Sequence, residues 1–307
     1  MVLLLILLKR LAVMFIFIII GAILYRKNKV TEKGSASLAN LLITLILPCV
    51  IIKSFLTEHT RQQTIYLLYS LLFSLIILAI AICIARIFFR KDAIAHFAAA
   101  FSNPGFFGIP LILAVLGDSA VLLAAPFIAY LNIFQSTYGV AVLTGEKGKS
   151  SISIKKIVVS PFIISFIIGL LLFFLPVTLP QIVEDVITAS ANLNTPIAMI
   201  VSGVYLAKTD IKAMVKNIKL YGISAVRLIV IPLIALGVLS ILPDEFLPLK
   251  MCLLIAVSCP VGSNVAVYAQ LHQKDYCYAA ETVVISTLLS ALTIPLLVML
   301  AQIIWHV

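Results

Sequence analysis

The chain has 307 residues, of which 63% are hydrophobic and 11% are charged, and its formal net charge is +10. Soluble domains carry roughly 25% charged residues. This composition therefore excludes a water-soluble fold, and with it a disordered chain or a nucleic-acid-binding protein. A helix that crosses a lipid bilayer needs about 20 mostly apolar residues, so the apolar residues suffice for about nine or ten such helices.

Charged and turn-forming residues divide the chain into ten apolar segments. Each is long enough for a helix, whereas the strands of membrane barrels alternate over roughly ten residues. We therefore predict an all-α integral membrane protein with ten transmembrane helices. The predicted spans cover residues 4–25, 37–57, 64–86, 93–116, 119–143, 154–175, 181–206, 218–242, 246–270 and 276–305.

Basic residues are distributed unevenly between the two sides of these spans. Of the 22 Lys and Arg residues, 16 lie in loops after odd-numbered spans, five lie on the opposite side, and Arg227 lies inside a span. Cytoplasmic loops of membrane proteins are enriched in Lys and Arg. The distribution predicts a multi-pass protein of the plasma membrane, the inner membrane in a bacterium. Its loop 144–153 would be cytoplasmic and both termini extracytoplasmic.

Prolines interrupt corresponding spans in the two halves of the chain, residues 1–143 and 154–307. Leu47-Pro48 in the second span corresponds to Thr195-Pro196 in the seventh. Asn103-Pro104-Gly105 in the fourth corresponds to Cys259-Pro260-Val261-Gly262 in the ninth. Because each half has five spans, the second half enters the membrane from the opposite side, which predicts an inverted repeat. The alternative for a single proline is a tolerated kink.

The breaks in the fourth and ninth spans have the chemistry of a binding site. Proline lacks an amide hydrogen and frees a backbone carbonyl, while glycine lets the chain unwind. Unwound backbone at membrane depth must face protein or a water-filled cavity, and exposed helix ends attract ions. Neutral polar residues there can hold a carboxylate without a buried Lys or Arg. The candidate substrate-binding residues at the breaks are Ser102, Asn103, Pro104, Gly105, Pro260, Ser263 and Asn264.

These motifs resemble a known family of transporters. Residues 102–111 read Ser-Asn-Pro-Gly-Phe-Phe-Gly-Ile-Pro-Leu and resemble the fourth-helix motif of the auxin efflux carrier family. Asn194-Thr195-Pro196 resembles its seventh helix, and residues 227–232 resemble its eighth. Residues 259–264 and 282–290 are similar to the ninth and tenth. The short loop after the fifth span is similar to that of prokaryotic members.

The resemblance implies a secondary transporter that moves a small organic anion, of the malonate or malate class, by elevator-like alternating access. It implies a dimer-forming scaffold of spans 1, 2, 6 and 7 and a moving transport unit of spans 3–5 and 8–10. Spans 4 and 9 would cross at the substrate. In plant members an Asn beside each break contacts the substrate carboxylate. Asn103 matches this position in span 4, whereas Cys259 occupies it in span 9 and the nearest Asn is Asn264.

Other polar residues inside the predicted spans have more than one interpretation each. Asn132 and Gln135 lie one turn apart in span 5, and they either line the cavity or join helices by hydrogen bonds. Glu281 in span 10 is either a proton-coupling residue or an acid at the membrane interface. Arg227 in span 8 either contacts the anion, pairs with Glu281 in coupling, or clamps backbone carbonyls.

Other functions are less well supported by the sequence. The four histidines are dispersed, and no Walker motif occurs, so we expect no enzyme, no metal site and no cofactor. A sodium- or proton-coupled symporter or antiporter of the related bile-acid-symporter or cation-antiporter folds is the main alternative. Such carriers usually have an acid beside the crossing. A membrane sensor would need a signalling domain, and a channel does not require paired helix breaks.

Overall fold

The computed structural model of the chain describes residues 2–57, 59–145, 159–175 and 177–306. Regular secondary structure in these ranges is helical, apart from one isolated antiparallel bridge between Ser102 and Val261. The all-α class predicted from the sequence is therefore confirmed. The count of ten spans and the inverted repeat stay predictions. Most of the predicted cytoplasmic loop, from residue 146 on, lies outside the described residues.

Three helices of the first half, α2, α4 and α5, begin at polar residues that cap free amide groups. The Thr60 hydroxyl accepts a hydrogen bond from the Gln63 amide, and the Asp92 carboxylate accepts one from the Ala95 amide. Such caps satisfy donors that have no partner inside the helix. The helices are α1 (Val2–Arg26), α2 (Glu32–Leu41), α3 (Leu47–Phe55), α4 (Arg61–Phe88), α5 (Ala93–Ala100), α6 (Ile109–Leu116), α7 (Val121–Phe134) and α8 (Val140–Thr144).

The second half repeats this use of caps. Asp210, Asn217 and Asp275 each accept a hydrogen bond from a backbone amide in the first turn of the following helix. The helices are α10 (Pro161–Phe174), α11 (Gln181–Asn192), α12 (Asn194–Lys208), α13 (Ile211–Lys216), α14 (Ile218–Ala225), α15 (Ile231–Leu239), α16 (Leu247–Ser258), α17 (Asn264–Leu271) and α18 (Tyr276–Ile304).

Several prolines follow a wide π-helical turn. A proline inside a helix has no amide hydrogen, and its ring meets the carbonyl group one turn earlier. A π-helical turn widens the backbone at that point, so the helical path continues instead of breaking. The turns and their prolines are Leu42–Ile46 with Pro48, Pro104–Gly108 with Pro110, and Val226–Val230 with Pro232.

Helix lengths agree with part of the predicted span pattern. Among the described residues, six helical stretches are long and apolar enough to cross a membrane, and they match predicted spans 1, 2, 3, 5, 8 and 10. The fourth, seventh and ninth predicted spans are each interrupted and so consist of two shorter helices. The six stretches are Leu4–Arg26, Glu32–Phe55, Arg61–Phe88, Asp118–Thr144, Ile218–Leu239 and Tyr276–Ile304.

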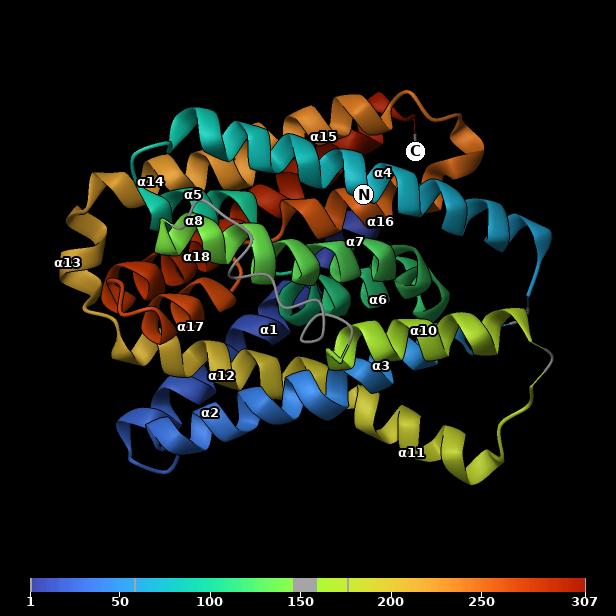
Figure 1. Cartoon of the computed structure of the whole chain (residues 1–307), viewed down its shortest axis with the longest axis horizontal. Helices are drawn as coiled ribbons and strands as arrows, with labels where there is room; N and C mark the ends of the chain where they lie inside the picture. The colour runs from blue at the N-terminus through green and yellow to red at the C-terminus, as the bar shows by residue number, and fades with distance from the viewer. Residues whose placement is uncertain (1, 58, 146–158, 176, 307) are drawn as a thin grey trace.

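The helices pack as two groups that lie side by side (Figure 1). In one group, α1 lies along α12, and α3 packs against α10 and α11. In the other, α4 packs against α5 and α7, while α18 packs against α14 and α17. The interrupted fourth and ninth spans belong to this second group, so their breaks are held within one set of helices.

Glycines allow α1 and α12 to approach closely. A side-chain carbon added at Gly203 would lie 2.1 Å from the Ile18 carbonyl oxygen, and one added at Gly21 would lie 2.3 Å from the Ile200 carbonyl oxygen. Small residues permit such backbone contact between membrane helices. The Gly21 and Gly203 contact therefore fixes the crossing of α1 and α12.

We expect Gly203→Ala to lower the free energy of unfolding by about 1–3 kcal/mol, because the added methyl group overpacks the contact. Thermal unfolding of the purified protein in detergent measures this loss. The matched control is Gly237→Ala on α15, where an added carbon meets nothing within 4 Å. That variant should be neutral or slightly stabilised, because alanine favours helix. Equal stability of the two variants would contradict the close contact.

Candidate functional site

The two broken spans cross each other and are joined by their unwound backbones. The Asn103 amide donates to the Pro260 carbonyl at 2.9 Å, and the Gly262 amide donates to the Phe101 carbonyl at 3.0 Å. Glycine is required at 262, because a side-chain carbon there would lie 2.9 Å from the Ser102 carbonyl oxygen. The helix breaks predicted at residues 102–105 and 258–262 are therefore present, at residues 101–103 and 259–263, and they form a single crossing.

Arg227 holds the helix ends on one side of this crossing. Its guanidinium donates to the carbonyls of Ala99 and Ala100 at 3.0 and 3.1 Å, and also to the carbonyl of Val257. These carbonyls end α5 and α16, where each helix dipole is negative. The side chain is 1% exposed and does not line the cavity described below. Of the interpretations open from the sequence, this geometry matches the carbonyl clamp.

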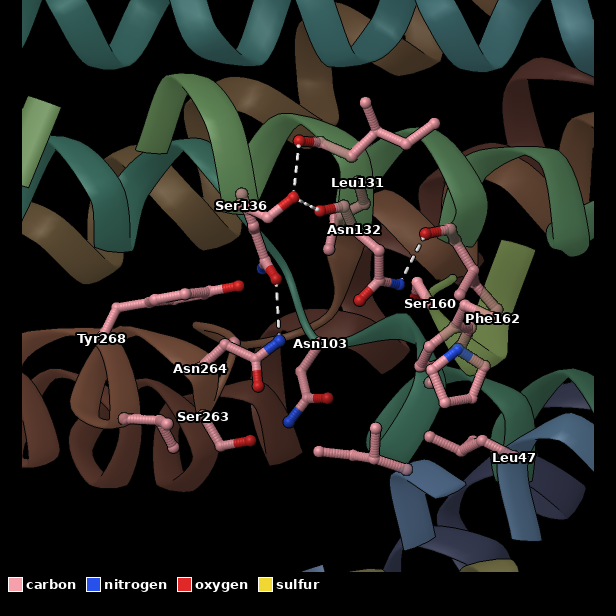
Figure 2. A pocket seen from close by; sticks show the side chains of 18 of the residues that line it. Leu47, Asn103, Leu131, Asn132, Ser136, Ser160, Phe162, Ser263, Asn264 and Tyr268 are labelled. Carbon is pink, nitrogen blue, oxygen red and sulfur yellow. Dashed lines mark hydrogen bonds between the residues drawn. The ribbon is translucent and has the colours of Figure 1, made fainter. Parts of the chain in front are cut away.

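A cavity of about 1140 Å³ lies on the other side of the crossing. Its walls are formed by the start of α3, the crossing itself, α7 with the turn after it, the start of α10, and α17 (Figure 2). Its polar lining residues are Ser102, Asn103, Asn132, Gln135, Ser136, Thr137, Ser160, Ser263, Asn264, Tyr268 and His272.

Asn103 both caps a helix and faces the cavity. Its side-chain oxygen accepts a hydrogen bond from the Phe106 amide at 3.3 Å, at the start of the π-helical turn that leads into α6. The side-chain amide nitrogen points away from this cap and toward the cavity (Figure 2). Asn103 can therefore donate to a ligand without giving up its structural role.

Gln135 and Asn264 form an amide pair across the cavity wall. The Asn264 side-chain nitrogen donates to the Gln135 side-chain oxygen at 2.8 Å, which joins the turn after α7 to the start of α17. The Gln135 side-chain nitrogen is buried and has no hydrogen-bond partner. Buried donors are normally satisfied, so a donor left open beside a cavity is a candidate ligand contact.

Asn132 is partly occupied by its own helix. Its side-chain nitrogen donates to the Ile128 carbonyl at 2.8 Å, one turn back in α7. The Ser136 hydroxyl in turn donates to the Asn132 and Ile133 carbonyls at 2.9 and 3.1 Å. Asn132 therefore presents its side-chain oxygen to the cavity. This oxygen is a hydrogen-bond acceptor and does not attract an anion.

The structure brings eight of the nine predicted substrate-binding residues into the cavity lining, and the ninth is Pro260. Pro260 is at the crossing, where its carbonyl pairs with Asn103. Glu281 lies on α18 beside Asn217, Asp210 and Asp275 and is not in the cavity lining. The residues that line the cavity are Ser102, Asn103, Pro104, Gly105, Asn132, Gln135, Ser263 and Asn264. Their part in binding stays a prediction.

Sequence reasoning missed several lining residues. Ser136 and Thr137 directly follow Gln135, and Tyr268 lies one helical turn after Asn264, so their spacing was a usable signal. Ser160 and Phe162, at the start of α10, had no such signal. They reach the cavity only because α10 packs against α3 and near α7.

Comparison with known proteins adds an independent line of information. A family model described as "Membrane transport protein" matches residues 6–298. The chain is similar to a "Putative malonate transporter" of Rhizobium meliloti, with 28% identity over 249 residues that cover 76% of this chain and 73% of that protein. It is also similar to an "Uncharacterized transporter" of Methanothermobacter thermautotrophicus, with 26% identity over 201 residues that cover 65% of each.

Proposed function

The chain belongs to the membrane transport protein family, as its resemblance to the auxin efflux carriers predicts, and we propose that it is a secondary carrier of small carboxylates. It binds an organic anion of the malonate class in the cavity beside the crossing. It moves this anion across the plasma membrane by elevator-like alternating access.

The observation that carries this proposal is the neutral, amide-lined cavity at the crossing of two broken helices. Asn103 and the buried Gln135 offer amide nitrogens there, and the ends of two short helices meet at the same place. Carboxylates accept hydrogen bonds from amides strongly, because such bonds are assisted by the charge. The name of the Rhizobium relative supports the same class of substrate.

The grouping of the helices supports a moving unit and a fixed one. We propose that α1–α3 and α10–α12 form the scaffold, which also makes a homodimer, and that α4–α8 and α14–α18 carry the substrate. Polar contacts between the groups include Asn194 to the Gly105 carbonyl at 3.3 Å and Lys53 to Asp118 at 3.2 Å. Such contacts can exchange partners when one group slides. The ten-span inverted repeat and the extracytoplasmic termini belong to this proposal.

The cavity lining favours this reading over a cation-coupled carrier with an acid at the crossing. Among the described lining residues none is Asp or Glu. The proposed coupling ion is a proton or a sodium ion, with Glu281 as the proton candidate. Arg227 is better assigned to the clamp, because its donors already bind three carbonyls.

Binding of a carboxylate should raise the thermal stability of the purified protein. A ligand that binds only the folded state adds about 2.7 kcal/mol to its stability at 100 times its Kd. We expect malonate to shift the melting temperature upward, whereas its uncharged diamide should not. A malonate shift that requires sodium would assign sodium as the coupling ion. A shift with the diamide and none with any carboxylate would contradict the proposed substrate class.

A further inference from the structure

The cavity has no full charge of its own among the residues that the structure describes. Its lining contains no Asp, Glu, Lys or Arg, and its titratable side chains are Tyr268 and His272. His272 follows α17, eight residues beyond Asn264, which places it about 12 Å farther along the helix direction. It therefore stands well away from the amide pair of Gln135 and Asn264.

The charged groups on the surrounding helices lie outside the cavity lining. Arg10 on α1 donates to the Thr195 hydroxyl at 3.0 Å, and Arg86 on α4 lies beside Tyr138 and His96. The positive charge of Arg227 is bonded to the ends of α5 and α16, and each helix end is equivalent to about half a negative charge. The positive charge of the guanidinium is therefore neutralised by these two helix ends and attracts an anion in the cavity only weakly. Glu281 on α18 faces Asn217, and His96 on α5 is hydrogen-bonded to Tyr138 at 3.2 Å.

The two helix N-termini at the crossing together attract an anion with the equivalent of about one positive charge. The helix Pro104–Leu116 and α17 both begin there, and each helix start is equivalent to about half a positive charge. Independently, the Gln135 side chain is 1% exposed and its amide nitrogen lacks a partner. This arrangement matches one carboxylate.

We infer that the cavity takes a dicarboxylate in its singly charged form, with one carboxylate at the amides and the second carboxyl group still protonated. The described lining has no Lys or Arg to pair with a second carboxylate, and a charge without a partner is strongly unfavourable wherever the site excludes water. The proton is then carried on the substrate itself, so each transported molecule moves one proton and one negative charge, and no acid of the protein needs to titrate. This inference rests on the proposed function as a carboxylate carrier.

The test compares malonate with malonamate, its half-amide, which keeps a single charge at all pH values above the ionisation of its one carboxyl group. The affinity of the purified protein for malonate should fall about tenfold for each pH unit above malonate's second ionisation, because only the singly charged fraction binds. The affinity for malonamate should stay constant over the same range. Monomethyl malonate serves as a second singly charged probe of different shape.

Two variants separate this inference from titration of the protein. Glu281→Gln and His272→Asn should both keep the difference between malonate and malonamate. The inference would be overturned if malonate and malonamate affinities changed equally with pH and this change disappeared in one of the variants. The titrating proton would then belong to the side chain replaced in that variant. Malonate affinity that does not fall with pH would also overturn it, although the carrier function would stand. Absence of binding by every carboxylate at every pH would instead reject the proposed function, and this inference with it.

Discussion

Replacing Arg227 with methionine is expected to lower the free energy of unfolding by on the order of 3–5 kcal/mol, the largest stability loss predicted for this chain. Three buried carbonyls, of Ala99, Ala100 and Val257, would lose a charged donor. A hydrogen bond to a charged group contributes about 1.5–3 kcal/mol, and bonds in one network do not add fully. The ends of α5 and α16 would also face each other without a cation. Thermal unfolding in detergent measures the effect.

Arg227→Lys should lose much of the same stability, because a single ammonium group cannot reproduce the planar fork of donors that reaches two helices. The control is Arg90→Met, which removes the same charge from an exposed position and should change stability little. The measurement also separates the roles open from the sequence. A direct anion contact predicts a stable Arg227→Met protein with lowered substrate affinity, and that result would contradict the clamp.

The sequence locates the helix breaks because proline and glycine act locally. Pro104, Gly105 and Pro260 prevent a regular α-helix wherever the rest of the chain lies. The structure places unwound backbone at residues 101–103, directly before the π-helical turn that Pro104 begins, and at residues 259–263 around Pro260. The apolar segments are equally readable, since a bilayer requires a minimum length of apolar helix. Both features follow from short stretches of sequence, which is why they could be predicted.

The partner of each polar side chain could not be predicted in the same way. An amide can bond to its own helix, to a neighbouring helix or to a ligand, and only the packing decides between them. Asn132 bonds to its own helix, Asn264 bonds to Gln135 across two helices, and Asn103 caps the turn before α6. The pairing of Asn103 with Pro260 joins residues far apart in the chain, so it depends on the assembled fold.

The capping role of Asn103 changes the substitution that best tests the site. Asn103→Ala would remove both the helix cap and the donor. Asn103→Asp keeps an oxygen to accept from the Phe106 amide, and an acid is favourable at a helix start, so the protein should stay as stable as the wild type. The same change replaces the amide donor with a negative charge in the cavity.

Asn103→Asp is expected to weaken malonate binding by at least about 10- to 150-fold, since a lost hydrogen bond to a charged group costs roughly 1.5–3 kcal/mol and repulsion between like charges adds to the loss. Titration calorimetry on the purified protein measures the affinity. The matched control is Asn192→Asp on α11, which adds the same charge at an exposed position outside this cavity and should bind as the wild type does. Wild-type affinity in a stable Asn103→Asp protein would mean that the break in span 4 is only a hinge. The anion would then have to bind away from the crossing, because no site beside Asn103 could accept a second negative charge without loss of affinity.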